Sequence, residues 1–116
     1  MPGYVVGRLV SLFGDLKGKK IQVIGVSYKA DVADTRETPA SAVISILKSK
    51  GATVTWHDPL VKSWNGESSS PVDKGADLGL VLVAHKKLDL SGFSAPIFTI
   101  NPNPKFPNWS PLLSVR

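Results

Sequence analysis

Residues 20–59 read KIQVIGVSYKADVADTRETPASAVISILKSKGATVTWHDP, and the fold class can be predicted from this segment. The short apolar, β-branched run at 20–26 predicts a buried strand. A helix then opens at Thr38-Pro39 and ends at Gly51, and alternating residues at 52–57 predict a second strand. A strand, a helix and another strand in this order are typical of a parallel sheet. We therefore expect the α/β class.

The helix has clear signals at both ends. Thr38 is a good N-cap, and Pro39 fits the first helical position because its missing N–H would be unpaired there. Gly51 supplies the left-handed conformation that commonly ends a helix. Apolar side chains recur at helical spacing between these ends. They are Ala40, Val43, Ile44 and Leu47.

The flanking sequence extends this pattern. Residues 1–13 predict a further helix, since their apolar side chains also recur at helical spacing. The apolar runs at 78–83 and 97–100 predict a third strand and a shorter fourth one. We expect irregular structure in the serine-rich segment 61–72 and in the proline-rich tail from residue 101.

Composition limits the chemistry of the chain. Its 116 residues fit one domain, with 42% hydrophobic and 20% charged residues. The absence of cysteine excludes disulfides, thiolate zinc sites and a cysteine nucleophile within this sequence. His57 and His85 are far apart in sequence, so we expect no metal site. No apolar run approaches the ~20 residues of a membrane span and no signal peptide is evident, so a cytoplasmic protein is expected.

The net charge of +5 raises the question of an anionic partner. The densest basic cluster is Lys17, Lys19 and Lys20, with no aromatic side chain between them. We interpret it as a solvated turn before the first strand, and expect neither a nucleic-acid nor a membrane partner. The sequence also lacks any G-x-G motif, so it is not expected to bind NAD by itself.

The loop at 27–38 is the main candidate site. Parallel sheets bind ligands at the carboxyl ends of their strands, and this loop leaves from that edge. It brings Lys29 and Arg36 next to a helix N-terminus, where exposed N–H groups and the helix dipole favour phosphate. Tyr28 offers a ring that can stack on a base or a sugar.

Each of these candidates has a structural alternative. Asp34 and Glu37 can pair with the two cations of the loop and only stiffen it, and the residues alone do not decide between the two roles. His57 and Asp58 form a candidate acid/base pair, but Asp58 is more often a turn residue that binds local backbone. His85, which follows the third predicted strand, is likewise a candidate acid/base residue that more often has a structural role.

Four short motifs follow one another along this region. They are Gly25-x-x-Tyr28-Lys29, Asp34-x-Arg36-Glu37-Thr38-Pro39, Gly51-Ala52-x-Val54 and Asp58-Pro59-x-Val61. In order and spacing they resemble the C-terminal domain of the UDP-glucose/GDP-mannose dehydrogenase family. The resemblance implies a Rossmann-like, three-layer α/β/α fold with a short, mainly parallel sheet. It also implies that 1–16 end a linker helix and that 17–116 form a UDP-sugar-binding domain.

The resemblance carries expected roles to individual positions. Tyr28 and Lys29 match the pair that contacts the nucleotide sugar. Arg36 matches an arginine that reaches toward NAD, which the first domain of such enzymes binds. No residue of this chain is expected to be catalytic or to bind a metal. The residues expected to shape the loop are Asp34, Glu37 and Thr38.

Members of this family oxidise the C6 alcohol of a nucleotide sugar to a carboxylate with NAD. The resemblance therefore implies a fragment of a UDP-sugar 6-dehydrogenase of polysaccharide biosynthesis, acting on UDP-glucose or a UDP-N-acetylhexosamine. The fragment alone is expected to be inactive and without cofactor. Its implied partners are a UDP-sugar and the other domains of the parent enzyme, and a homodimer remains open.

One departure favours a different class of function. The family usually has an Asp-x-Arg segment after the fourth strand, whose arginine can touch the ligand. This sequence has Ile100-Asn101-Pro102-Asn103 at that place. The alternative is a stand-alone interaction or regulatory module that kept the fold and lost nucleotide binding.

Overall fold

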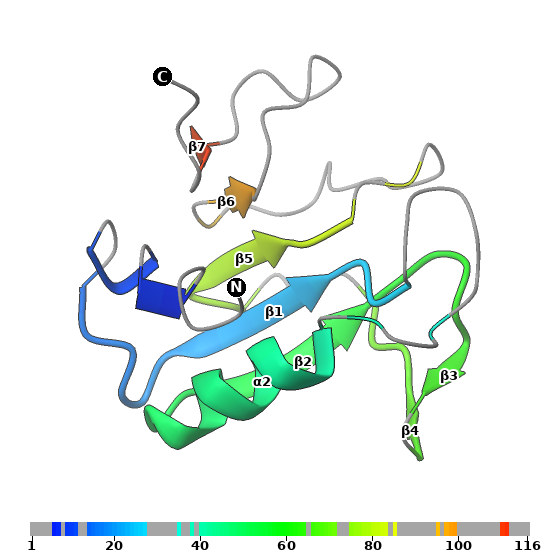
Figure 1. Ribbon diagram of the computed structural model, residues 1–116, viewed down its shortest axis with the longest axis horizontal. Coiled ribbons are helices and arrows are strands. Elements are labelled where there is room, and N and C mark those ends of the chain that lie inside the picture. The colour runs from blue at the N-terminus through cyan, green and yellow to red at the C-terminus, as the bar shows by residue number, and fades with distance from the viewer. Residues whose placement is uncertain are drawn as a thin grey trace.

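The computed structural model of the chain contains a parallel sheet with the strand order β2-β1-β5-β6-β7 (Figure 1). Its strands are β1 (Lys20–Ile24), β2 (Thr53–His57), β5 (Leu78–Val81), β6 (Ile97–Thr99) and β7 (Ser110–Pro111). The predicted α/β class and the mainly parallel sheet are confirmed. The structure describes residues 6–7, 9–11, 14–27, 35, 38, 40–64, 66–71, 75–83, 85, 95 and 97–99, and the backbone of 110–111.

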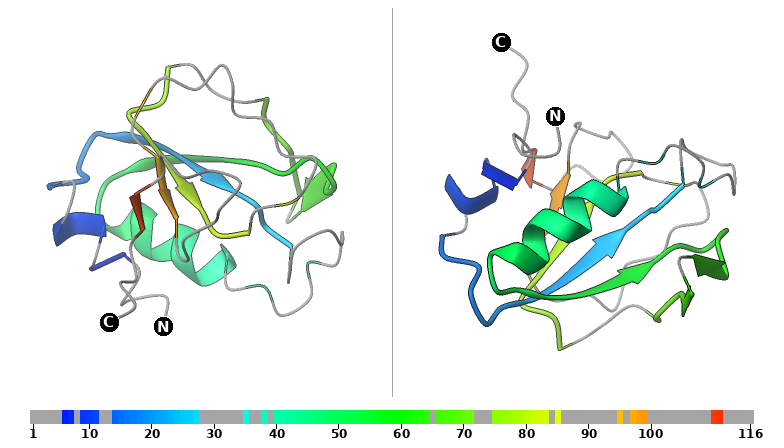
Figure 2. Two further views of the ribbon diagram at one scale, coloured as in Figure 1. Left: turned by 90° about the horizontal axis from the view of Figure 1, so that it is seen from above. Right: turned by 60° about the horizontal axis from the view of Figure 1, so that its bottom comes forward.

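Helix α2 (Ala40–Ser49) lies against one face of the sheet, beside β1 and β2 (Figures 1 and 2). The predicted apolar stripe faces inward, with Ala40, Val43 and Leu47 buried. The Ala40 N–H donates to Thr38 Oγ1 over 3.2 Å, as an N-cap hydroxyl allows. Gly51 follows the helix with φ +88°, so the predicted start and end of this helix are confirmed.

The core lies between α2, the sheet and the helical residues at 6–7 and 9–11. Val6 and Leu9 are fully buried in it, which confirms the predicted N-terminal helix over those residues. The rest of that predicted helix lies outside the described residues. The described residues do not test the predicted second helical layer of the three-layer arrangement, which stays a prediction. No helix in the described part of the chain is both long and apolar enough to cross a membrane.

Two expectations of irregular structure are wrong. Within 61–72, β3 (Ser63–Trp64) and β4 (Glu67–Ser68) form an antiparallel pair, and Gly66 between them has φ +76°. Strands this short and polar show no alternation, although Asn-Gly between them is a strong hairpin signal. In the tail, β7 pairs with β6. A proline is tolerated there because β7 is an edge strand.

The register of the sheet places the carboxyl ends of three strands side by side. Ile24 pairs with His57 on one side and with Val81 on the other. Gly25 then turns the chain with φ +85°, and a Cβ at this position would lie within 2.8 Å of Val83 N and closer still to its carbonyl oxygen. Only glycine allows this approach. The residues that follow β1, β2 and β5 therefore meet at one edge of the sheet.

Candidate functional site

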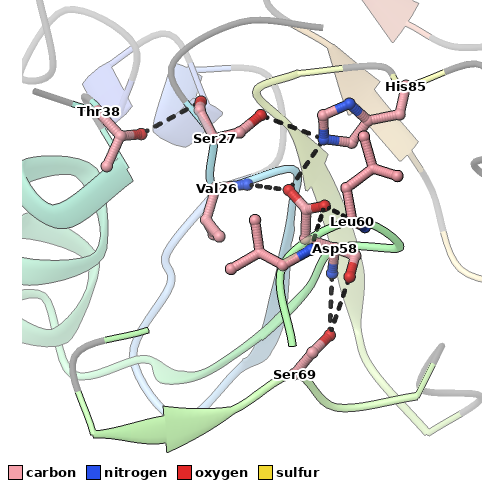
Figure 3. Close-up of polar contacts among 8 residues, drawn as sticks. Val26, Ser27, Thr38, Asp58, Leu60, Ser69 and His85 are labelled. Atoms are coloured by element: carbon pink, nitrogen blue, oxygen red, sulfur yellow. Dashed lines mark hydrogen bonds and ion pairs between the residues drawn. The ribbon is translucent and has the colours of Figure 1, made fainter. Parts of the chain in front are cut away.

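Asp58, the first residue after β2, is buried at this edge and connects the three strand ends (Figure 3). Its Oδ2 accepts the Val26 N–H at 2.9 Å and lies 3.0 Å from Nε2 of His85. Its Oδ1 accepts the backbone N–H groups of Leu60 at 2.8 Å and Val61 at 3.2 Å. One carboxylate thus ties together the segments that follow β1, β2 and β5.

The geometry confirms the structural interpretation of the His57-Asp58 pair. Asp58 caps its own turn through Leu60 and Val61, as an aspartate at a strand end commonly does. The His57 Nδ1 donates instead to the carbonyl oxygen of Ser70, 2.8 Å away. The two neighbouring side chains bind different partners, so they form no acid/base pair.

His85 also contacts the hydroxyl of Ser27, which lies 3.2 Å from the same Nε2 atom. Because a carboxylate accepts hydrogen bonds, we assign the Nε2 proton to the bond with Asp58. A nucleophilic triad needs its serine and its carboxylate on opposite nitrogens of the imidazole, which is not the case here. Ser27, Asp58 and His85 are each at least 97% buried. They form a buried polar cluster that holds backbone in place.

Thr38 links the cluster to α2 (Figure 3). Its hydroxyl donates to the carbonyl oxygen of Ser27 over 3.4 Å and accepts the Ala40 N–H. The two ends of the candidate loop, Ser27 and Thr38, are therefore joined directly. Five of the sequence-predicted site residues lie between these ends, outside the described residues. They are Tyr28, Lys29, Asp34, Arg36 and Glu37.

The sequence gives no individual role to Ser27, and it offers His85 only as a candidate acid/base residue with a structural alternative. The usable signal was positional, since Ser27, Asp58 and His85 each follow shortly after a strand of the same parallel sheet. Adjacent strand ends converge in such sheets, which is where polar side chains can meet. Within the described part of the chain, no cluster of three acidic, histidine or cysteine side chains is placed to hold a metal.

A groove lies away from the cluster residues, between α2 and the β3–β4 hairpin. It is an open groove of about 300 Å³. Trp64 lines it, and the centroid of its ring lies 5.7 Å from that of Trp56 in an edge-on arrangement. The residues that line the groove are Ser41, Ile44, Ser45, Lys48, Trp64 and Glu67.

The sequence profile of the UDP-glucose/GDP-mannose dehydrogenase family, UDP binding domain, matches residues 22–97. The chain belongs to this family. The match confirms the resemblance that the four sequence motifs indicated, and it contains the whole buried cluster. The cluster and the loop base are therefore features of a UDP-binding domain of UDP-sugar dehydrogenases.

Individual relatives show the same likeness over part of their length. UDP-glucose 6-dehydrogenase of Rickettsia typhi is 42% identical over 60 residues, 51% of this chain and 14% of that protein. UDP-N-acetyl-D-mannosamine dehydrogenase of Methanococcus maripaludis is 38% identical over 90 residues, 73% of this chain and 21% of that protein. The chain thus spans 14–21% of the length of these two relatives.

The fold agrees with solved structures of such enzymes. The UDP-N-acetyl-mannosamine dehydrogenase of Staphylococcus aureus superposes with a TM-score of 0.66 at 32% identity. The alignment covers 84% of this chain and 26% of that enzyme. This UDP-binding domain therefore has the fold of one part of a larger dehydrogenase.

Proposed function

We propose that this chain is the nucleotide-sugar-binding C-terminal domain of an NAD-dependent UDP-sugar 6-dehydrogenase. In this proposal residues 1–16 end the linker helix from a central domain, and 17–116 form the binding domain. Membership of the family and the names of its relatives support it. The observation that supports it most is the hydrogen bond between Thr38 and Ser27, the residues at the two ends of the candidate loop. Ser27 lies after β1, at the carboxyl edge of the sheet, where parallel sheets commonly bind ligands.

The loop supplies the proposed contacts. Tyr28 and Lys29 would bind the UDP-sugar, with the Lys29 ammonium acting as a point charge against the diphosphate. Arg36 would reach toward NAD, where its planar guanidinium suits bidentate contact with a phosphate. Asp34 and Glu37 would shape the loop together with Thr38, whose hydroxyl already bonds Ser27.

The described residues of this chain do not fit a dinucleotide cradle. The turn after β1 contains Gly25 and no further glycine, whereas such a cradle needs several. The Val26 N–H, which a phosphate would need as a donor, is already bonded to Asp58. NAD would therefore be held mainly by other domains of the parent enzyme, and the chain alone is expected to be inactive and to bind no cofactor.

The proposal includes the biological setting of the parent enzyme. Relatives are named for both UDP-glucose and UDP-N-acetyl-D-mannosamine, so the substrate would be UDP-glucose or a UDP-N-acetylhexosamine. The uronate product suits polysaccharide biosynthesis in the cytoplasm. The other domains of the enzyme would be partners, and the intact enzyme would form a homodimer. Neither nucleic acid nor membrane is proposed as a partner.

Isothermal titration of the 116-residue chain with UDP tests the binding role. We expect saturable binding that Lys29→Ala weakens by at least about tenfold, since one lost charged contact costs more than 1 kcal/mol. Lys50→Ala is the matched control, because Lys50 is an exposed lysine just after α2. Absence of binding at millimolar UDP by a folded chain would contradict the proposal.

The rival function is an interaction or regulatory module without a nucleotide site. The sequence Ile100-Asn101-Pro102-Asn103, in place of the usual Asp-x-Arg segment, favours it. Such a module would show the same response to UDP with Lys29→Ala as without it. The titration therefore separates the two functions.

A further inference from the structure

We infer that His85, acting with Asp58, is a positioning residue for nucleotide-sugar binding. The inference rests on the proposed function, because it concerns the residues that would hold Tyr28 and Lys29 in place. Neither His85 nor Asp58 would touch the ligand. They would act through Val26 and Ser27, the last residues before the loop.

Three side chains from three parts of the fold converge on this short segment (Figure 3). Asp58 Oδ2 accepts the Val26 N–H, and His85 Nε2 lies 3.2 Å from the Ser27 hydroxyl. Thr38 donates to the Ser27 carbonyl oxygen. The segment is thus held through its backbone N–H, its carbonyl oxygen and its side chain. These contacts determine where the chain enters the loop.

The contacts between His85 and Asp58 are shielded from water. Both side chains have zero exposed surface, and their polar atoms are 3.0 Å apart. A buried pair of this kind contributes little net stability compared with apolar residues of the same size, because removing the two groups from water is costly. Its hydrogen bonds are directional, so they favour one arrangement of the segment over others. This is what positioning requires.

The distance from this segment to the proposed ligand contacts is short. Tyr28 and Lys29 are the next two residues after Ser27. Since consecutive Cα atoms lie about 3.8 Å apart, a displacement of Ser27 is passed on to both with little attenuation. Misplacing a binding group by about 1 Å can cost as much as ~100-fold in function. A small shift at the cluster is therefore enough to weaken binding.

Two substitutions at one position test this role. His85→Leu introduces an apolar side chain of similar length and removes the N–H donor. His85→Gln returns an N–H donor near the place of Nε2. Asp58 keeps its bonds to Val26, Leu60 and Val61 in both variants, so both are expected to fold. The control is Asp77→Ala, which removes a side-chain bond to the Lys20 N–H at the opposite end of β1.

The measurements are UDP affinity by titration and the midpoint of thermal unfolding. We expect His85→Leu to weaken UDP binding by about tenfold or more and His85→Gln to recover most of that loss. Asp77→Ala should lower the unfolding midpoint without changing affinity. The inference is overturned if folded His85→Leu binds UDP as the unmodified chain does, or if Asp77→Ala weakens binding equally.

A second measurement without ligand separates this inference from the proposed function. The amide chemical shifts of Tyr28 and Lys29 should change in His85→Leu and remain unchanged in Asp77→Ala. If the unmodified chain fails to bind UDP while these shifts change, the proposed function fails and the positioning of the segment stands. If the shifts are the same in both variants, the positioning role itself is wrong.

Discussion

The hydroxyl of Thr38 donates a hydrogen bond to the carbonyl oxygen of Ser27, eleven positions earlier in the chain. The same oxygen atom of Thr38 accepts the first N–H of α2, over 3.2 Å. One side chain therefore caps a helix and closes the base of the candidate loop. Local helix formation and loop placement are coupled through it.

Thr38→Val removes the hydroxyl and keeps the β-branched shape. We expect a loss of about 1 kcal/mol in the free energy of unfolding, which is typical for a lost N-cap. UDP affinity should fall as well, because the tie to Ser27 is lost. Denaturant unfolding and titration measure the two effects. Thr38→Ser retains the hydroxyl, so it should behave like the unmodified chain in both.

Gly25→Ala should be among the most damaging small substitutions. The added methyl group would meet the backbone of Val83 at a position with φ +85°. We expect a loss on the order of 2–4 kcal/mol from strain and overlap combined. Gly66→Ala is the matched comparison, since Gly66 also has positive φ but open space around it. Equal unfolding midpoints for the two variants would argue against the overlap with Val83.

Asp58→Asn replaces a carboxylate, in which both oxygens accept hydrogen bonds, with an amide that has one acceptor oxygen and one donor nitrogen. In the native chain Oδ2 accepts from Val26 and His85, and Oδ1 accepts from Leu60 and Val61. Whichever oxygen the amide nitrogen replaces, it then faces two donors. We expect a loss on the order of 3–5 kcal/mol, as for other broken buried charge networks. Asp77→Asn, at an exposed site, should lower the free energy of unfolding by less than about 1 kcal/mol. Equal losses measured by chemical denaturation would contradict the central role of Asp58.

Trp56 is buried in the core, and its indole N–H has no hydrogen-bond partner among the described residues. Trp56→Phe removes this unpaired donor but also some packing volume. The two effects oppose each other, so we expect a net change within about 1 kcal/mol. Leu47→Ala, which only opens a cavity, should cost about 2–5 kcal/mol. Thermal unfolding measures the stability of both variants. A loss for Trp56→Phe as large as that for Leu47→Ala would contradict the expectation that the two effects at Trp56 nearly cancel.

Local sequence patterns predicted most of the fold correctly where elements are long or well marked. Helix α2 has an N-cap, an apolar stripe and a terminal glycine, all of which act within a few residues. The β3–β4 pair was missed because each strand has two residues, too few for any periodicity to appear. The β7 strand was missed because its pairing depends on β6 and not on its own residues.

From the sequence alone follow the order of β1, α2, β2, β5 and β6, the family and the loop with the expected ligand contacts. Propensities, caps and spaced motifs are local, so they are readable from neighbouring residues alone. That Ser27, Asp58 and His85 form one buried cluster is visible only in the folded chain. Ser27 and His85 are 58 positions apart. They meet because parallel pairing aligns the carboxyl ends of β1, β2 and β5, and this register results from packing of the whole sheet.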